Sequence, residues 1–193
     1  MNIAKIAFDF DDAFKDVMTN RVKTVNKITA EKDIVYDASD PETCKLDVYY
    51  PPRDGKKLPV LFDVHGGGWI TGDKHWRRGL NKAFADMGLF VVCPNYGLSP
   101  KFKYPACVTH LYKALEWVRD NAEKYDLDLN NMFITGDSAG GQLACLMLAA
   151  QGNPELLKRL KIEKEPLRFK GGLLVCGAYD PEGMAKNPLS NKM

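Results

Sequence analysis

Short apolar runs alternate with longer amphipathic segments through most of this chain, and the alternation predicts strands that are each followed by a helix. Apolar runs predict strands at 59–64, 89–93, 132–135 and 171–179. Apolar positions three and four residues apart predict helices at 76–87, 106–125 and 139–151. This order favours an α/β fold with a mostly parallel sheet, joined by right-handed crossovers and flanked by helices.

The first fifty residues follow a different pattern. Apolar alternation predicts a half-buried antiparallel pair of strands at 34–36 and 46–50, the second one ended by two prolines. Helical spacing at 5–27 predicts a helix within residues 1–30, which would either cap a site or pack on the body for stability. The polar segment 152–170 predicts a helix-loop excursion, and the length of 193 residues fits a single domain, 1–193.

The segment 136–141, Gly-Asp-Ser-Ala-Gly-Gly, lies between a predicted strand and a predicted helix. This context is typical of a sharp turn that presents a nucleophilic serine, here Ser138, in strained backbone geometry. Side chains at Gly136 and Gly140 would collide where strand and helix meet. We expect Asp137 to shape the turn and to hydrogen-bond nearby backbone, because a neighbour of the serine cannot readily orient a histidine. The five-residue pattern alone is short enough to occur by chance.

A second glycine-rich segment, His65-Gly66-Gly67-Gly68-Trp69, ends the strand predicted at 59–64. Without side chains, its backbone N–H groups can approach a ligand closely. Acyl transfer needs such donors around the oxygen that becomes negative, and here they would come from Gly67, Gly68 and Ala139. The alternative is a plain glycine turn between a strand and a helix. We expect Trp69 to pack at the mouth of the site.

Together these segments resemble the hormone-sensitive-lipase-like branch of the α/β-hydrolases and the small bacterial acetyl and feruloyl esterases. The matching residues are His65–Trp69, Gly72–Lys74, Asn95–Pro100, Tyr104–Ala106 and Gly136–Gly141. The resemblance covers about residues 34–179 and implies an α/β-hydrolase fold. It also implies a nucleophilic Ser138, an oxyanion hole formed by Gly67, Gly68 and Ala139, and a structural role for His65.

Two positions depart from the family pattern. The family usually has an arginine where this chain has Gly97, and often an acidic residue near His110. We expect these departures to change local packing and surface ion pairs while leaving the chemistry as it is.

A serine nucleophile needs a histidine base and an acid that orients it, and these should follow the serine in chain order. All three histidines, His65, His75 and His110, precede Ser138, and the later acids match no catalytic aspartate. A fragment of a longer esterase, a site completed by a second chain, and an inactive protein would each account for this. We expect a chain truncated before the triad aspartate and histidine, with C-terminal strands missing and little activity by itself.

The apolar run at 173–176 is typical of a strand buried on both faces. If nothing pairs with its outer side, it becomes an exposed apolar edge. Self-association or a second chain is therefore expected to cover it. His75 is expected at the surface near the start of a helix and His110 on a helix against the sheet, which makes both weak candidates for the base.

Composition limits the kinds of partner that we expect this chain to bind. A net charge of +2 gives no reason to expect nucleic acid, and no apolar run is long enough to span a membrane. Five cysteines without paired spacing predict buried free thiols in a reducing, cytoplasmic compartment, and no metal or cofactor is implied. We expect an esterase of small or short-chain acyl esters. The alternatives are an amidase such as an arylformamidase, and a non-catalytic small-molecule-binding protein of the same fold.

Overall fold

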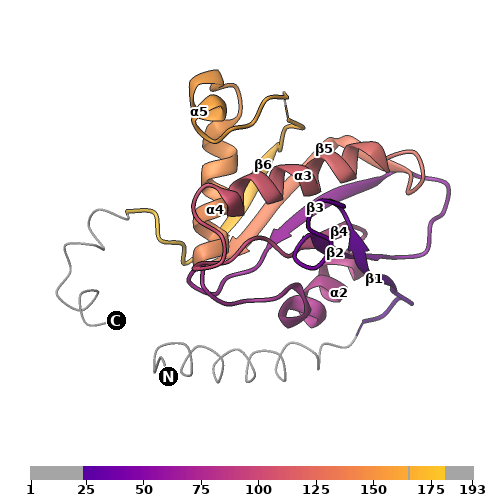
Figure 1. Ribbon diagram of the computed structural model, residues 1–193. Helices are drawn as coiled ribbons and strands as arrows, with labels where there is room; N and C mark the ends of the chain where they lie inside the picture. Colours follow the sequence, from indigo (N-terminus) through magenta and orange to yellow (C-terminus); the bar gives the residue numbers. More distant parts are fainter. Residues whose placement is uncertain (1–23, 165, 181–193) are drawn as a thin grey trace.

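The computed structural model describes residues 24–164 and 166–180 (Figure 1). Within this part, six strands form one sheet in the order β1-β2-β4-β3-β5-β6. The strands are β1 (Thr29–Val35), β2 (Lys45–Tyr50), β3 (Leu58–Val64), β4 (Phe90–Pro94), β5 (Leu127–Asp137) and β6 (Gly171–Val175). β3 to β6 pair in parallel, whereas β1 and β2 pair antiparallel. The predicted mostly parallel sheet is confirmed.

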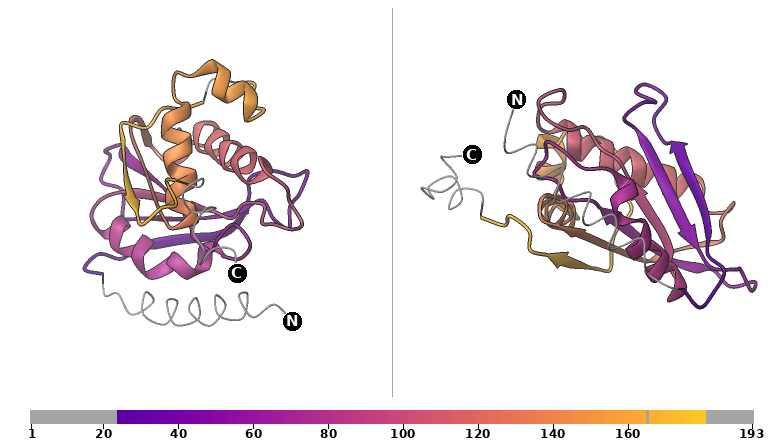
Figure 2. Two further views of the ribbon diagram at one scale, coloured as in Figure 1. Left: turned by 90° about the vertical axis from the view of Figure 1, so that its left-hand side faces the viewer. Right: turned by 90° about the horizontal axis from the view of Figure 1, so that it is seen from below.

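Helices cover both faces of the sheet (Figure 2). They are η1 (Lys74–Arg77), α2 (Arg78–Asp86), α3 (Ala106–Asp120), α4 (Ala139–Ala150) and α5 (Pro154–Arg159). α3 and α4 lie on one face, and α2 lies on the opposite face. The helix predicted at 76–87 starts earlier, as a 3-10 turn, because the Asp73 side chain accepts a hydrogen bond from the backbone N–H of His75. The helix predicted at 106–125 ends at Asp120 and continues as turns.

The two faces of the sheet have different cores. Alternate residues of β3 supply Val60, Phe62 and Val64 to the larger apolar core under α3 and α4. The α2 face carries a small apolar cluster that includes Leu61. The expectation that β2 is half-buried is wrong: Asp47 and Tyr49 are fully buried. The second face of β2 is closed because α2 and η1 pack against it.

The two strands that follow β3 in the sequence lie on opposite sides of it in the sheet. β4 pairs with one side of β3 and β5 with the other side, both in parallel. The loops after β3 and β5 therefore leave the same edge of the sheet, next to each other. In open α/β sheets, ligands bind in the crevice at such a switch point, outside the carboxyl ends of the strands.

β6 forms an edge of the sheet in the described residues and ends at Val175, earlier than predicted. Its Leu173 and Val175 side chains are 61% and 42% exposed. An apolar strand edge of this kind is a site where another strand can pair.

Two expectations about the rest of the chain need correction. The helix predicted at 5–27 lies mostly outside the described residues, but 24–27 are not helical. There the backbone N–H groups of Val25 and Asn26 donate to the Asp86 carboxylate at the end of α2. The five thiols are free, but not all are buried: Cys176 is exposed and Cys145 is partly exposed.

Candidate active site

Ser138 occupies the turn between β5 and α4 and is exposed to solvent. Its backbone has φ 50° and ψ −119°, in a region that non-glycine residues rarely adopt, which agrees with the strained turn predicted from the sequence. Its N–H donates to the Val175 carbonyl over 2.9 Å, and its carbonyl accepts from the N–H of Gln142 over 3.1 Å. Hydrogen bonds to both neighbouring elements therefore hold the strained turn in place.

Two glycines permit the close contact between strand and helix at this turn. A Cβ atom on Gly140 would lie 2.1 Å from the Val64 carbonyl oxygen, and one on Gly136 would lie 2.5 Å from the Gly140 carbonyl oxygen. Both contacts are with backbone, which cannot rotate away. The predicted packing reason for these glycines is confirmed.

The loop after β3 turns sharply through three residues with positive φ: Gly67 at 119°, Gly68 at 60° and Trp69 at 62°. The Gly67 carbonyl accepts from the N–H groups of Ile70 and Thr71, which closes the loop. Among the described residues, the N–H groups of Gly67, Gly68 and Ala139 donate to no backbone carbonyl. These three donors, at the same edge of the sheet as Ser138, are available for a ligand.

Gly66 brings this loop against the serine turn. A Cβ atom on Gly66 would lie 2.7 Å from Oδ2 of Asp137 and 2.9 Å from the Asp137 carbonyl oxygen. The loop and the turn are therefore in direct contact through the residue that precedes Ser138.

His65 lies inside the loop, fully buried. Its ring stacks on Tyr96 with centroids 4.3 Å apart, and the Tyr96 hydroxyl donates to the His65 carbonyl over 2.8 Å. Its Nδ1 lies 2.7 Å from the Gly66 carbonyl oxygen, which can only accept, so Nδ1 carries the proton. Burial lowers the pKa of His65 below its ordinary value. These contacts make His65 a neutral residue that shapes the loop.

Asp137 does not have the backbone partner that we expected. Its Oδ1 accepts from Nη1 of Arg77 over 2.6 Å, and the two side chains form an ion pair. Arg77 also donates twice to Asp63 of β3. The sequence contains a signal that Asp63 is paired, because a charged residue inside the apolar run 60–64 requires a buried partner, but it does not say which one.

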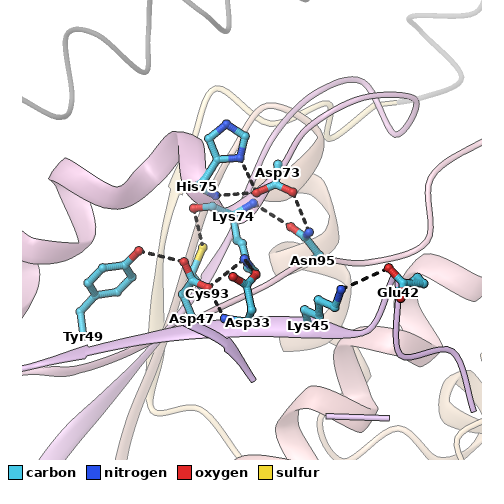
Figure 3. A network of polar contacts seen from close by, with 10 residues as sticks. All are labelled: Asp33, Glu42, Lys45, Asp47, Tyr49, Asp73, Lys74, His75, Cys93 and Asn95. Carbon is cyan, nitrogen blue, oxygen red and sulfur yellow. Dashed lines mark hydrogen bonds and ion pairs between the residues drawn. The ribbon is translucent and has the colours of Figure 1, made fainter. Parts of the chain in front are cut away.

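A second polar network surrounds η1 (Figure 3). Asp73 accepts from the N–H of His75 over 2.8 Å, contacts His75 Nδ1 at 2.6 Å and accepts from the Asn95 amide over 2.8 Å. Lys74 points to the opposite side, where its Nζ lies 2.7 Å from Asp33 and 2.8 Å from the buried Asp47. These interactions fix the segment that follows the glycine loop.

Neither His75 nor His110 is joined to Ser138 by a hydrogen bond in the described residues. His75 is partly exposed, as predicted, and its Nδ1 is engaged by Asp73. His110 is buried on α3, and its Nδ1 accepts from the Gly97 N–H over 3.1 Å. The structure therefore assigns no base to Ser138 from among the three histidines.

Trp69 lines a cavity of about 450 Å³ beside the glycine loop. Phe102 and Tyr104 contribute further aromatic surface to this cavity, and Gln142 and Leu143 line it from the first turns of α4. The cavity thus lies between the glycine loop and the helix that follows Ser138, and its lining suits an apolar group. Across residues 24–164 and 166–180, no group of three or more His, Cys, Asp or Glu side chains could hold a metal ion. None of the helices described is both long enough and apolar enough to cross a membrane.

Comparison with known proteins agrees with this geometry. Residues 46–185 match the model of the BD-FAE family. The chain is 30% identical over 193 aligned positions to a protein of Acanthamoeba polyphaga mimivirus whose name assigns it provisionally to the α/β-hydrolases. It is 35% identical over 127 positions to the esterase LipQ of Mycobacterium tuberculosis. These alignments cover 90% and 64% of this chain but 51% and 30% of the relatives, so the chain spans about half of the first and less of the second.

Among solved structures, an inhibited form of esterase B from Lactobacillus rhamnosis superposes with a TM-score of 0.88 at 26% identity. The superposition covers 98% of this chain and 62% of esterase B. The strand order and the two glycine-rich loops therefore belong to a fold that known esterases share.

Proposed function

The chain belongs to the BD-FAE family of α/β-hydrolases, and from this premise we propose that it hydrolyses small carboxylic esters through an acyl-enzyme on Ser138. The observation that carries the proposal is the position of Ser138. A serine with φ 50° stands exposed at the carboxyl edge of the sheet, at a turn in contact with a loop that presents unused N–H groups. We also propose that the described elements belong to one α/β-hydrolase domain.

In the proposed reaction, Oγ of Ser138 attacks the ester carbonyl carbon while its proton passes to a base. The N–H groups of Gly67, Gly68 and Ala139 donate to the oxygen that becomes negative. Each such donor contributes about 3–4 kcal/mol to lowering the barrier. The tetrahedral intermediate then expels the alcohol, which takes up the proton and leaves an acyl-serine. Attack by water on this acyl group releases the carboxylic acid and restores the serine.

The base and its orienting acid are not assigned by the residues described. His65 is enclosed in the loop, His110 accepts from Gly97, and His75 is bound to Asp73. Without a triad histidine, serine hydrolases retain only a rate enhancement of about 10³–10⁴ over water. We therefore expect weak turnover of p-nitrophenyl acetate by this chain alone.

Short or compact acyl esters are the proposed substrates. The cavity of about 450 Å³ beside Trp69 is within the range of small-ligand pockets and is largely apolar. Esterase B has been crystallised in a form inhibited by a tributyrin phosphonate, an analogue of a short-chain ester. This supports a phosphonate as a probe for Ser138.

Two further parts of the proposal concern the surroundings of the site. A second chain pairing with the outer edge of β6 would use the backbone groups of that edge, beside the exposed Leu173 and Val175, and chemical crosslinking tests this pairing. We also propose a cytoplasmic location, which is supported by five cysteines that are all free thiols.

A fluorophosphonate probe followed by intact-mass measurement tests the nucleophile. Because no base is assigned to Ser138, the expected result is an adduct that forms slowly, maps to Ser138 and is absent from Ser138→Ala. The matched control is Ser99→Ala, because Ser99 lines the cavity beside Trp69 and is not the proposed nucleophile.

A wild-type chain that stays unmodified after prolonged incubation contradicts the proposal. If such a chain still binds small esters tightly, it is a binding protein of the same fold, an alternative favoured by the lack of a histidine bonded to Ser138. Cleavage of p-nitroacetanilide in preference to p-nitrophenyl acetate would instead indicate an amidase.

A further inference from the structure

The guanidinium group of Arg77 lies between two carboxylates from different parts of the proposed site. Its Nε and Nη2 donate to the two oxygens of Asp63, each over 2.7 Å. Its Nη1 donates to Oδ1 of Asp137 over 2.6 Å. The first two bonds form a planar fork on the carboxylate of β3, and the third reaches the last residue of β5.

This cluster is shielded from solvent. The Asp63 side chain is 0% exposed, that of Arg77 14% and that of Asp137 31%. Although burial opposes the charge, the two aspartates raise the pKa of Arg77, so the guanidinium stays charged at every ordinary pH. Ion pairs of this kind are screened by salt much less than pairs on the surface.

Asp137 connects the guanidinium to both glycine-rich loops. It directly precedes Ser138, and its Oδ2 fills the space that a side chain on Gly66 would occupy, 2.7 Å from the Cβ position. Contacts therefore run without a break from Asp63 through Arg77 and Asp137 to Gly66. One arginine after the glycine loop thus links β3, the glycine loop and the serine turn.

We infer that Arg77 is a positioning residue that holds the serine turn in register with the glycine loop. The inference rests on the proposed function, because it gives Arg77 the task of keeping Oγ of Ser138 aligned with the N–H groups of Gly67 and Gly68. Arg77 itself touches no substrate in this role. Alignment matters because misplacing a reacting group by about 1 Å can slow a reaction about 100-fold.

The geometry requires arginine specifically. Lysine keeps the charge, but its single ammonium group cannot form a fork on Asp63 and also reach Asp137. Arg77→Lys should therefore fold yet loosen the link between the two loops. Asp137→Asn tests the other end of this link, at the serine turn. It keeps the shape of the side chain and leaves the Arg77–Asp63 pair intact.

The experiment compares these two variants with wild-type chain by two readouts. Amide hydrogen exchange followed by mass spectrometry reports the protection of 65–69 and 136–141. The second-order rate of fluorophosphonate addition to Ser138 reports how well the serine turn is aligned with the glycine loop. Arg53→Lys is the matched control, because Arg53 pairs with Asp126 on the exposed surface. Leu115→Ala controls for stability, since Leu115 is a buried residue of α3 in the larger apolar core and is not a member of the ion-pair cluster.

We expect exchange to rise in both segments in Arg77→Lys and Asp137→Asn, and labelling to slow by about 10-fold to 100-fold. Arg53→Lys should change neither readout. Unchanged labelling in a folded Arg77→Lys would overturn the inference and leave the proposed function standing. Equal rises of exchange in these segments in Leu115→Ala would also overturn it, because the effect would then be global.

Absence of labelling in the wild-type chain is a failure of the proposed function, and exchange in the two segments still decides the role of Arg77. If Arg77→Lys does not fold, Asp137→Asn alone decides it by the same two readouts.

Discussion

The backbone N–H of Gly97 donates to Nδ1 of His110 over 3.1 Å. These are the two positions at which we expected departures from the pattern of the family that the sequence resembles, an arginine and a nearby acidic residue. The structure brings the two departures together in one hydrogen bond. His110 is buried on α3, so this pair forms a packed contact within the fold.

Acidification should destabilise the protein through His110. Burial foremost, and then the charge of Lys113, lower its pKa below the ordinary 6.5. An unfolded chain therefore binds more protons than the folded one as the pH falls from about 6.5 toward the folded-state pKa, and the free energy of unfolding decreases there. Each such proton contributes a slope of up to about 1.4 kcal/mol per pH unit.

Urea unfolding between pH 7.5 and 5 measures this effect. His110→Gln should show a shallower decline than wild type, with the remaining slope due to His65, whose pKa burial also lowers. The charges of Asp40 and Asp37 also act on His110 and favour its protonation, whereas that of Lys101 opposes it. An unchanged slope in His110→Gln would show that His110 is not responsible.

Gly97→Ala should destabilise the fold by steric overlap with Phe102. A Cβ atom there would lie 2.7 Å from Cγ of the Phe102 ring. Overpacking of this kind costs about 1–3 kcal/mol. Phe102→Ala in the same chain removes Cγ and should recover part of the loss, and a double-mutant cycle by urea unfolding measures the coupling. Strict additivity of the two changes would contradict the predicted contact.

Gly140→Ala should cost about 3 kcal/mol or more, because its Cβ would lie 2.1 Å from the Val64 carbonyl oxygen and 2.5 Å from that of His65. Neither backbone atom can move without separating α4 from β3. The matched control is Gly171→Ala, since nothing lies within 4 Å of its Cβ position. That control should stay within about 0.5 kcal/mol of wild type. Thermal unfolding measures both variants. Equal decreases in the free energy of unfolding for Gly140→Ala and Gly171→Ala would refute the packing argument.

Removal of the Lys74 ammonium should be strongly destabilising (Figure 3). Although burial opposes the charge, the hydrogen bonds that Lys74 donates to the Asp33 and Asp47 carboxylates raise its pKa. Lys74→Met would leave Asp47, which is 0% exposed, without its cationic partner. Breaking a buried pair in this way costs about 3–5 kcal/mol.

Lys45→Met serves as the control for this change, because Lys45 pairs with Glu42, whose side chain is 84% exposed. Surface pairs contribute at most about 1 kcal/mol. Urea unfolding compares the two, and Lys74→Met with Asp47→Asn should regain part of the loss. Similar losses in the free energy of unfolding for Lys74→Met and Lys45→Met would show that the buried pair stabilises the fold no more than a surface pair does.

Local rules were enough to predict most of the elements from the sequence. The apolar run ending at Val64 and the helical spacing after Ser138 place β3 and α4 within a few residues of their observed bounds. Glycines at 136 and 140 signalled the close approach of strand and helix, because no other residue fits that contact. These features depend on neighbours in the chain, so periodicity and residue size reveal them.

Contacts between distant segments were decided only by the tertiary structure. Arg77 and Asp137 are 60 residues apart, and nothing in their separate surroundings says that they pair. The burial of Asp47 likewise depends on η1 and α2 closing over β2, which the alternation of apolar residues cannot show.

The residue pattern along the chain was thus enough to predict the order of strands and helices, the serine turn and the glycine loop, because backbone geometry and side-chain size act locally. The tertiary structure alone decided how these two loops are joined, because the charges that join them meet only when β3, η1 and β5 are packed together. Buried charges must find partners wherever the fold brings them, and sequence distance carries no information about that choice.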